Sequence, residues 1–136
     1  MRSKGCVVPP EPFEYAVLRV VPRVERGEGV NVGVVVFCRT RSYLGARIEL
    51  GTRQRSALAA LSDELDVDAI QAHLDEIVRI VEGDADGGPI ARLDAPERFR
   101  WVTSPSSTML QPSEVHGGLT ESPEQSLDDL FERLAR

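Results

Sequence analysis

Polar and charged residues gather in one short segment, residues 25–37, which reads ERGEGVNVGVVVF. Arg26 offers a planar fork of hydrogen-bond donors that suits phosphate or carboxylate, and Asn31 can both donate and accept. Because the segment runs into an apolar strand and not into a helix, it is not a helix-capped phosphate loop. Its glycines are equally typical of a tight turn, in which Glu28 would only face water. Two interpretations stay open: a recognition site and a plain turn.

A second candidate for chemistry is His116, which precedes two glycines in the segment SEVHGGLT, residues 113–120. A histidine in an exposed turn can act as a general base near neutral pH. Several serines are close to it in the sequence, yet the pattern does not resemble the strand–turn–helix elbow of a serine hydrolase. We interpret His116 either as a base or as an ordinary loop residue. The other histidine, His73, falls within a helical pattern and is expected to be structural.

The remaining polar residues predict no metal site and no cofactor. The acidic loop at Asp84 and Asp86 has too few ligands, at the wrong intervals, for a calcium loop. The two cysteines, Cys6 and Cys38, are distant from the histidines and form no zinc-binding spacing. Cys38 ends an apolar stretch and is expected to be a small buried hydrophobic residue.

Length and composition predict a single-domain protein of the cytoplasm. A chain of 136 residues can bury one hydrophobic core but not two. The longest apolar stretch, residues 32–38, is far shorter than the roughly 20 residues that span a bilayer. Prolines interrupt the N-terminal segment where a signal peptide would need a continuous apolar core. We therefore expect a cytoplasmic protein without a membrane association.

Charge is distributed unevenly along the chain. Residues 1–55 hold ten Lys and Arg against five Asp and Glu, a net +5, whereas residues 56–136 hold six against seventeen, a net −11. Either the acidic half covers the basic half within one domain, or a basic face stays exposed for an anionic partner. The overall net charge of −6 makes nucleic acid an unexpected partner. A weaker prediction is that nucleic acid binds to the arginines of the expected sheet: Arg19, Arg23, Arg41 and Arg47.

The pattern of apolar residues predicts strands in the first third of the chain. Residues 1–12 are expected to form an extended tail, because three prolines there oppose regular pairing. Runs rich in β-branched residues predict strands over residues 13–24, 32–38 and 44–50. Short connections between these strands favour an antiparallel meander.

Two later segments have less regular patterns. Residues 90–104 predict either a short helix or an irregular segment that places Phe99 and Trp101 in the core. Residues 107–111 predict one more strand added to the meander, and residues 116–120 predict a flexible turn.

Helical patterns occupy the middle and the end of the chain. Leucines at helical spacing predict one helix with Thr52 as its N-cap, and a second helix runs from Asp66 to about Gly83. Ser122, followed by proline, starts a C-terminal helix. The predicted fold is α+β: one domain over residues 13–136, in which a small antiparallel β-meander of three to four strands is packed by about three helices.

Three segments resemble the bacterial family called domain of unknown function 3037: YAVLRVVPRVERGEGVNVGVVVFC, LGAR and SSTMLQPSEV. That family has a Y-x-x-x-R-x-x-P strand, an R-G-E-x-x-N-x-G-V turn and strand, a helical middle, a Ser-x-x-x-Gln segment and a C-terminal helix. The resemblance covers about residues 13–136. The chain departs from it at Gly29 and Val30, where many relatives place a larger apolar residue before the valine. The matching positions are Tyr15, Arg19, Arg26, Gly27, Glu28, Asn31, Gly33, Ser107 and Gln111.

The resemblance implies a genetic context but no activity. Genes of this family often lie beside one for a HipA-like kinase, the type found in toxin–antitoxin modules. We therefore expect a small interaction or regulatory module that binds a partner protein, with such a kinase as one candidate partner. The expected contact residues are Arg19, Arg26, Glu28, Asn31, Ser107, Gln111 and His116.

The alternative is an enzyme that acts on a phosphate-bearing or nucleic-acid substrate. Arg26 would hold the anion, and Glu28 or His116 would be the base. Asn31 and Gln111 would orient the substrate. This alternative requires the side chains to converge in one pocket.

Overall fold

Three long strands at the start of the chain form the expected antiparallel meander in the computed structural model, which describes residues 9–105 and 109–136. They are β1 (Glu11–Val20), β2 (Val30–Cys38) and β3 (Tyr43–Ile48). Two shorter strands, β4 (Leu110–Pro112) and β5 (His116–Thr120), pair with the other side of β1. The result is a five-stranded antiparallel sheet, one strand more than expected.

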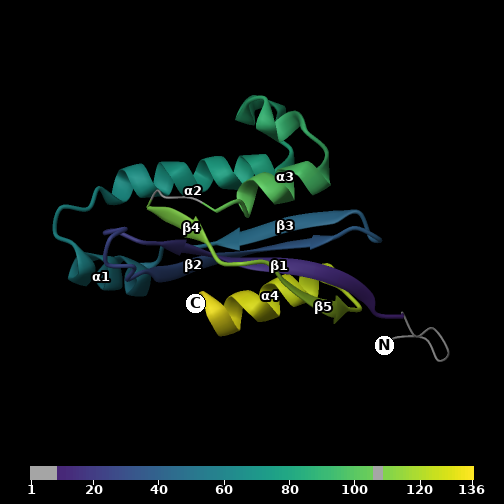
Figure 1. Cartoon of the computed structure of the whole chain (residues 1–136), viewed down its shortest axis with the longest axis horizontal. Coiled ribbons are helices and arrows are strands. Elements are labelled where there is room, and N and C mark those ends of the chain that lie inside the picture. The colour runs from purple at the N-terminus through teal and green to yellow at the C-terminus, as the bar shows by residue number, and fades with distance from the viewer. Residues whose placement is uncertain (1–8, 106–108) are drawn as a thin grey trace.

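Helices cover both faces of this sheet and confirm the α+β class (Figure 1). Two helices, α2 (Val67–Glu82) and α3 (Ala95–Val102), lie on one face. The last helix, α4 (Pro123–Leu134), lies on the other face, and α1 (Thr52–Leu61) follows the meander near the start of β2. Two short 3₁₀ turns join α2 to α3. The two segments, η1 and η2, are Ala85–Gly87 and Ile90–Arg92.

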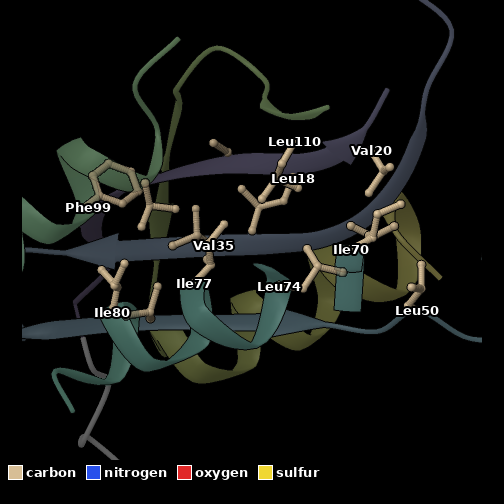
Figure 2. Close-up of a cluster of buried hydrophobic side chains, with 14 of the residues drawn as sticks. Leu18, Val20, Val35, Leu50, Ile70, Leu74, Ile77, Ile80, Phe99 and Leu110 are labelled. Atoms are coloured by element: carbon tan, nitrogen blue, oxygen red, sulfur yellow. The ribbon is translucent and has the colours of Figure 1, made fainter. Parts of the chain in front are cut away.

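The face under α2 and α3 holds the larger apolar core. Ile70, Leu74 and Ile77 of α2 point towards Leu18 and Val20 of β1 (Figure 2). These α2 positions are three and four residues apart, so they form one stripe of the helix, as the sequence predicts.

The face under α4 holds a second, smaller core. Phe131, which is almost fully buried, and Leu127 of α4 pack against Val34 and Val36 of β2. Arg47 of β3 lies over the Phe131 ring, with its guanidinium carbon 4.3 Å from the ring centroid. Because β2 is covered by α2 and α3 on one face and by α4 on the other, its continuous apolar sequence is explained.

Two of the three expected helix starts are confirmed. Asp66 accepts a hydrogen bond from the Ala69 N–H at 3.0 Å, and Ser122 accepts one from the Gln125 N–H at 3.3 Å. The α2 helix ends at Gly83, whose φ of 71° is a left-handed conformation that glycine adopts without strain. The first helix starts differently, because Gly51 is its N-cap and Thr52 is already helical.

Residues 116–120, expected to be a flexible turn, form strand β5 instead. Gly118 is needed for packing, because a β-carbon at this position would lie only 2.8 Å from the Phe13 ring. Ser113 connects β5 to β4: its N–H donates to the Val17 carbonyl and its Oγ accepts from the Val17 N–H. Pairing with β1 therefore overrides the local turn preference.

Trp101 does not join the core, contrary to the expectation. Phe99 is buried and stacks on Phe37 with ring centroids 5.3 Å apart, whereas Trp101 is 43% exposed. Residues 99 and 101 are separated by about 200° around a helix, so only one of them can face the sheet.

Candidate functional site

Arg19, an expected contact residue, and Tyr15, a position of the family pattern, lie on β1 and point to the face that carries α4. Tyr15 and Arg19 are four residues apart, and side chains of a strand alternate between faces, so the two share one face. Tyr15 lies opposite Val36 and packs against the α4 core cluster. Because Arg19 shares a face of β1 with Tyr15, its side chain also points to the α4 side of the sheet.

The neighbouring strands place three more candidates beside them. Arg19 lies opposite Asn31 on β2 and opposite Gln111 on β4, and Tyr15 lies opposite His116 on β5. Directly opposed residues of antiparallel strands point to the same face. We call this group the β1 strip: Tyr15, Arg19, Asn31, Gln111 and His116. Ser107, also a candidate, lies outside the described residues.

A β-bulge places Asn31 in this strip. The register passes from Leu18 opposite Gly33 to Arg19 opposite Asn31, so Val32 is an extra residue in β2. A bulge of this kind redirects the side chains that follow it. As a result Asn31 reaches α4, where its Nδ2 donates to the Leu134 carbonyl at 2.9 Å.

The bond from Asn31 belongs to a set that holds the end of α4. The last carbonyl groups of a helix have no N–H donor within the helix, so they need donors from elsewhere. Gln54 Nε2 donates to the Ala135 carbonyl at 2.9 Å, and Arg53 donates to the Arg136 carbonyl at 2.6 Å. Gln54 is only 5% exposed. Gln54 was not among the predicted site residues, although it comes four residues before Leu58, on the buried side of the helix, which is a usable signal.

The loop between β1 and β2 contains Arg26 and Glu28 and lies next to the strip. The N–H groups of Arg26 and Gly27 donate to the Arg23 carbonyl, and Gly27 has a φ of 70°, so the loop forms a tight turn. Arg26 Nε and Glu28 Oε1 are 2.7 Å apart, with side chains that are 61% and 49% exposed. Such an open ion pair contributes at most about 1 kcal/mol to stability. Both groups remain accessible from the solvent.

Arg19 connects the loop to the strip. A β-carbon at position 29 would lie 3.0 Å from Arg19 Nη2 and 2.9 Å from Val21 Cγ2, so the guanidinium lies against the Gly29 backbone. Glycine here permits this close approach. Gly29, where the chain departs from the family pattern, is therefore part of a packed contact.

Gly33 serves the sheet and not a ligand. A β-carbon at position 33 would lie 2.7 Å from Ile48 Cγ1 and 2.8 Å from the Arg47 carbonyl oxygen. The group that approaches the Gly33 backbone is thus the neighbouring strand β3. Three residues of the R-G-E-x-x-N-x-G-V pattern, Gly27, Asn31 and Gly33, have roles in the fold.

The other end of the strip is aromatic. The Tyr15 ring stacks on Phe13 with centroids 5.8 Å apart, and His116 tilts over Tyr15 at 5.4 Å. His116 is exposed. Ser113, the nearest serine to it along the described chain, uses its hydroxyl for backbone bonds, accepting from Val17 and donating to the Glu114 carbonyl.

The strip is extended in both directions. Asn31 and Gln111 are separated by two strand spacings, about 10 Å, and Tyr15 and Arg19 by four residues, about 13 Å. Hydrogen bonds reach only about 3 Å between heavy atoms. The arrangement therefore suits contact with a broad surface better than convergence on one reacting atom.

Two of the four arginines of the weaker nucleic-acid prediction are engaged within the protein. Arg47 pairs with Glu49 at 3.1 Å and with Asp128 at 3.5 Å. Arg41 donates to the carbonyls of Glu121 and Pro9. The acidic half of the chain thus neutralises part of the basic half.

Two other kinds of feature are absent from the described residues. Over residues 9–105 and 109–136, no three His, Cys, Asp or Glu side chains gather as a metal-binding group. In the same part of the chain, no helix combines the length and the apolar character needed to cross a membrane.

Comparison with known proteins gives a family and no activity. Residues 15–135 match a family described as a protein of unknown function (DUF3037). No curated protein and no solved structure matches the chain.

Proposed function

The chain belongs to the DUF3037 family, and we propose that it is a small binding module that docks a partner protein through the β1 strip and the adjoining β1–β2 loop. The main support is the spread of the polar row Asn31–Arg19–Gln111 over three strands. A protein partner contacts many points of such a surface at once. Protein interfaces bury about 800 Å² on each side, so the strip would be the centre of a larger contact.

The residue types of the strip suit this role. Tyr and Arg are enriched among the residues that dominate binding energy at interfaces. Tyr15 and His116 offer ring surfaces, and Arg19 offers a fork of donors that is held in place by Gly29. The exposed pair Arg26 and Glu28 extends the surface at one end.

The specific partner that we propose is a HipA-like kinase, acting in the cytoplasm as part of a toxin–antitoxin-type pair. Its support is the genetic context that the family resemblance implies. On this proposal the module alters the kinase activity by occupying a surface of the kinase.

Co-expression of the chain with a HipA-like kinase from the same operon tests the proposal. Size-exclusion chromatography should show one complex, and its Kd should rise at least tenfold in the variants Gln111→Ala, His116→Ala and Arg26→Ala/Glu28→Ala. The double variant preserves net charge. Arg92→Ala removes an exposed arginine from the η2 segment and serves as the control. Separate elution of the two wild-type proteins would refute the proposed partner. A complex whose Kd is unchanged in all these variants would refute the β1 strip and the adjoining loop as the docking surface.

The enzyme alternative has less support. Asn31 Nδ2 is engaged by the Leu134 carbonyl, and Arg26 is paired with Glu28. A role in orienting a substrate or holding an anion would first require these bonds to be exchanged. A partner protein can contact the surface around Asn31 while the bond from Asn31 to the Leu134 carbonyl stays intact.

A further inference from the structure

An apolar groove lies between α2 and β4, on the sheet face opposite the β1 strip. Two cavities of about 270 and 320 Å³ meet there, and both are lined by His73 and Leu110. The first extends to Ile77 and Trp101, and the second extends to Ile70. We call this feature the α2–β4 groove. His73, expected to be structural, is exposed on its rim.

The groove combines an apolar floor with exposed apolar side chains at its edges. Leu18, Ile77 and Leu110 of the floor are buried. Trp101 and Met109, at the edges, are 43% and 41% exposed. Large apolar side chains that remain open beside an apolar hollow are typical of a docking surface.

The rim on the α2 side is acidic. Asp66 lines the second cavity, and the exposed Asp63 and Glu64 come just before it. Glu76 is three residues from His73, so it lies on the same side of α2. An occupant that complements this rim carries positive charge beside its apolar groups.

The dimensions of the groove correspond to those of a short helix. From Asp66 to Ile77 it follows eleven residues of α2, about 17 Å or three helical turns. A helix that docks into a groove presents apolar side chains at positions such as i, i+4 and i+7. We propose that the α2–β4 groove binds a basic amphipathic α-helix of a partner protein, which places one apolar side chain in each cavity. This proposal concerns a different surface from the β1 strip and does not depend on it.

Trp101 provides a direct readout, because it is the single tryptophan of the chain and lines the groove. The probe is a synthetic peptide of Leu, Lys and Ala, with leucines on one helical face and lysines beside them. Titration with this peptide should shift the Trp101 emission to shorter wavelength and reduce its quenching by acrylamide. A peptide with Glu in place of Lys, and a Leu/Lys peptide of scrambled order, should each bind at least tenfold more weakly.

Two variants locate the binding. Ala69→Arg places a large cation in the second cavity from an exposed position, and it should weaken the Leu/Lys peptide at least tenfold while the far-ultraviolet circular dichroism stays unchanged. Asp66→Asn preserves the N-cap of α2 and removes one rim charge, so it should weaken binding about twofold to fivefold. Glu114→Gln removes the same charge from the β4–β5 connection and should have no effect.

Three results would overturn this proposal. The first is equal affinity for the Lys and Glu peptides, which would show that the acidic rim takes no part in recognising the peptide. The second is binding of the Lys peptide with no change at Trp101 or in the Ala69→Arg variant, which would place the peptide elsewhere. The third is no binding by the ordered Lys peptide. If the chain and the kinase form no complex, the expected binding of the Leu/Lys peptide to the α2–β4 groove is unchanged.

Discussion

Asn31 of β2 donates a hydrogen bond to the carbonyl of Leu134, which is 103 positions further along the chain. The bond ties the start of the second strand to the end of the last helix. It exists because Val32 is inserted as a bulge, which directs Asn31 to the α4 face. A residue that marks the family pattern in the sequence thus holds two distant parts of the fold together.

Replacement of Asn31 by alanine should lower the free energy of unfolding by about 1 kcal/mol, because the Leu134 carbonyl loses its donor. Urea unfolding measures the change. Gln71→Ala is the matched control: this amide donates to Asp75 on the surface of α2, so its loss should cost less than about 0.5 kcal/mol. Equal losses in the two variants would show that the contact with α4 contributes nothing.

Replacement of Gly33 by alanine should destabilise the protein by about 1–3 kcal/mol, because the new methyl group would overlap Ile48 and the Arg47 carbonyl. Thermal and urea unfolding both report the loss. In the control, Gly117→Ala, the nearest atom to the new methyl group is 3.8 Å away, and the stability should change by less than about 0.5 kcal/mol. A Gly33→Ala protein of wild-type stability would mean that β3 can move aside.

The helices α2 and α4 and the meander could be predicted because their signals are local. Asp66 and Gly83 bound α2 through capping chemistry that depends on neighbouring residues alone. The buried strand β2 was recognisable by its uninterrupted apolar sequence. The antiparallel order of the first three strands could also be predicted, because the connections between them are short.

The strand β5 and the β1 strip could not be predicted from local patterns. Gly117 and Gly118 favour a turn by themselves, and β5 forms because this segment pairs with β1 and the Phe13 ring lies against Gly118. The grouping of Arg19 with Asn31 and Gln111 depends on strand register and on a bulge, and neither is encoded within a few neighbouring residues. The sequence identified the residue types of the candidate site, whereas the register determines which of them lie together.

Replacement of Arg47 by alanine should lower the free energy of unfolding by about 1–2 kcal/mol. The variant loses the stacking on Phe131 and the ion pairs with Asp128 and Glu49. Arg47→Lys should recover only part of the loss, because a lysine lacks the planar group that covers the ring. Added salt should narrow the difference between Arg47→Lys and Arg47→Ala in urea unfolding, since it screens the ion pairs that a lysine can still form. Identical stabilities for these two variants at low salt would exclude an ionic contribution.

Tyr43 should make the protein less stable in alkaline solution. Burial raises the pKa of its phenol above the ordinary value of 10.0, and the carboxylates of Glu124 and Asp128 raise it further. The folded state therefore favours the protonated phenol. Its contribution to stability is fully present below pH 10.0 and is lost as the pH rises through the higher pKa of the folded state.

Ultraviolet titration of the Tyr15→Phe variant measures this pKa directly, because Tyr43 is then the single tyrosine of the chain. The phenolate should appear with a midpoint above 10.0, provided that the protein is still folded at that pH. Tyr43→Phe should lose less stability than the wild type between neutral and strongly alkaline pH. A midpoint at or below 10.0 in the folded protein, or parallel losses in the two proteins, would contradict the effect of burial beside α4.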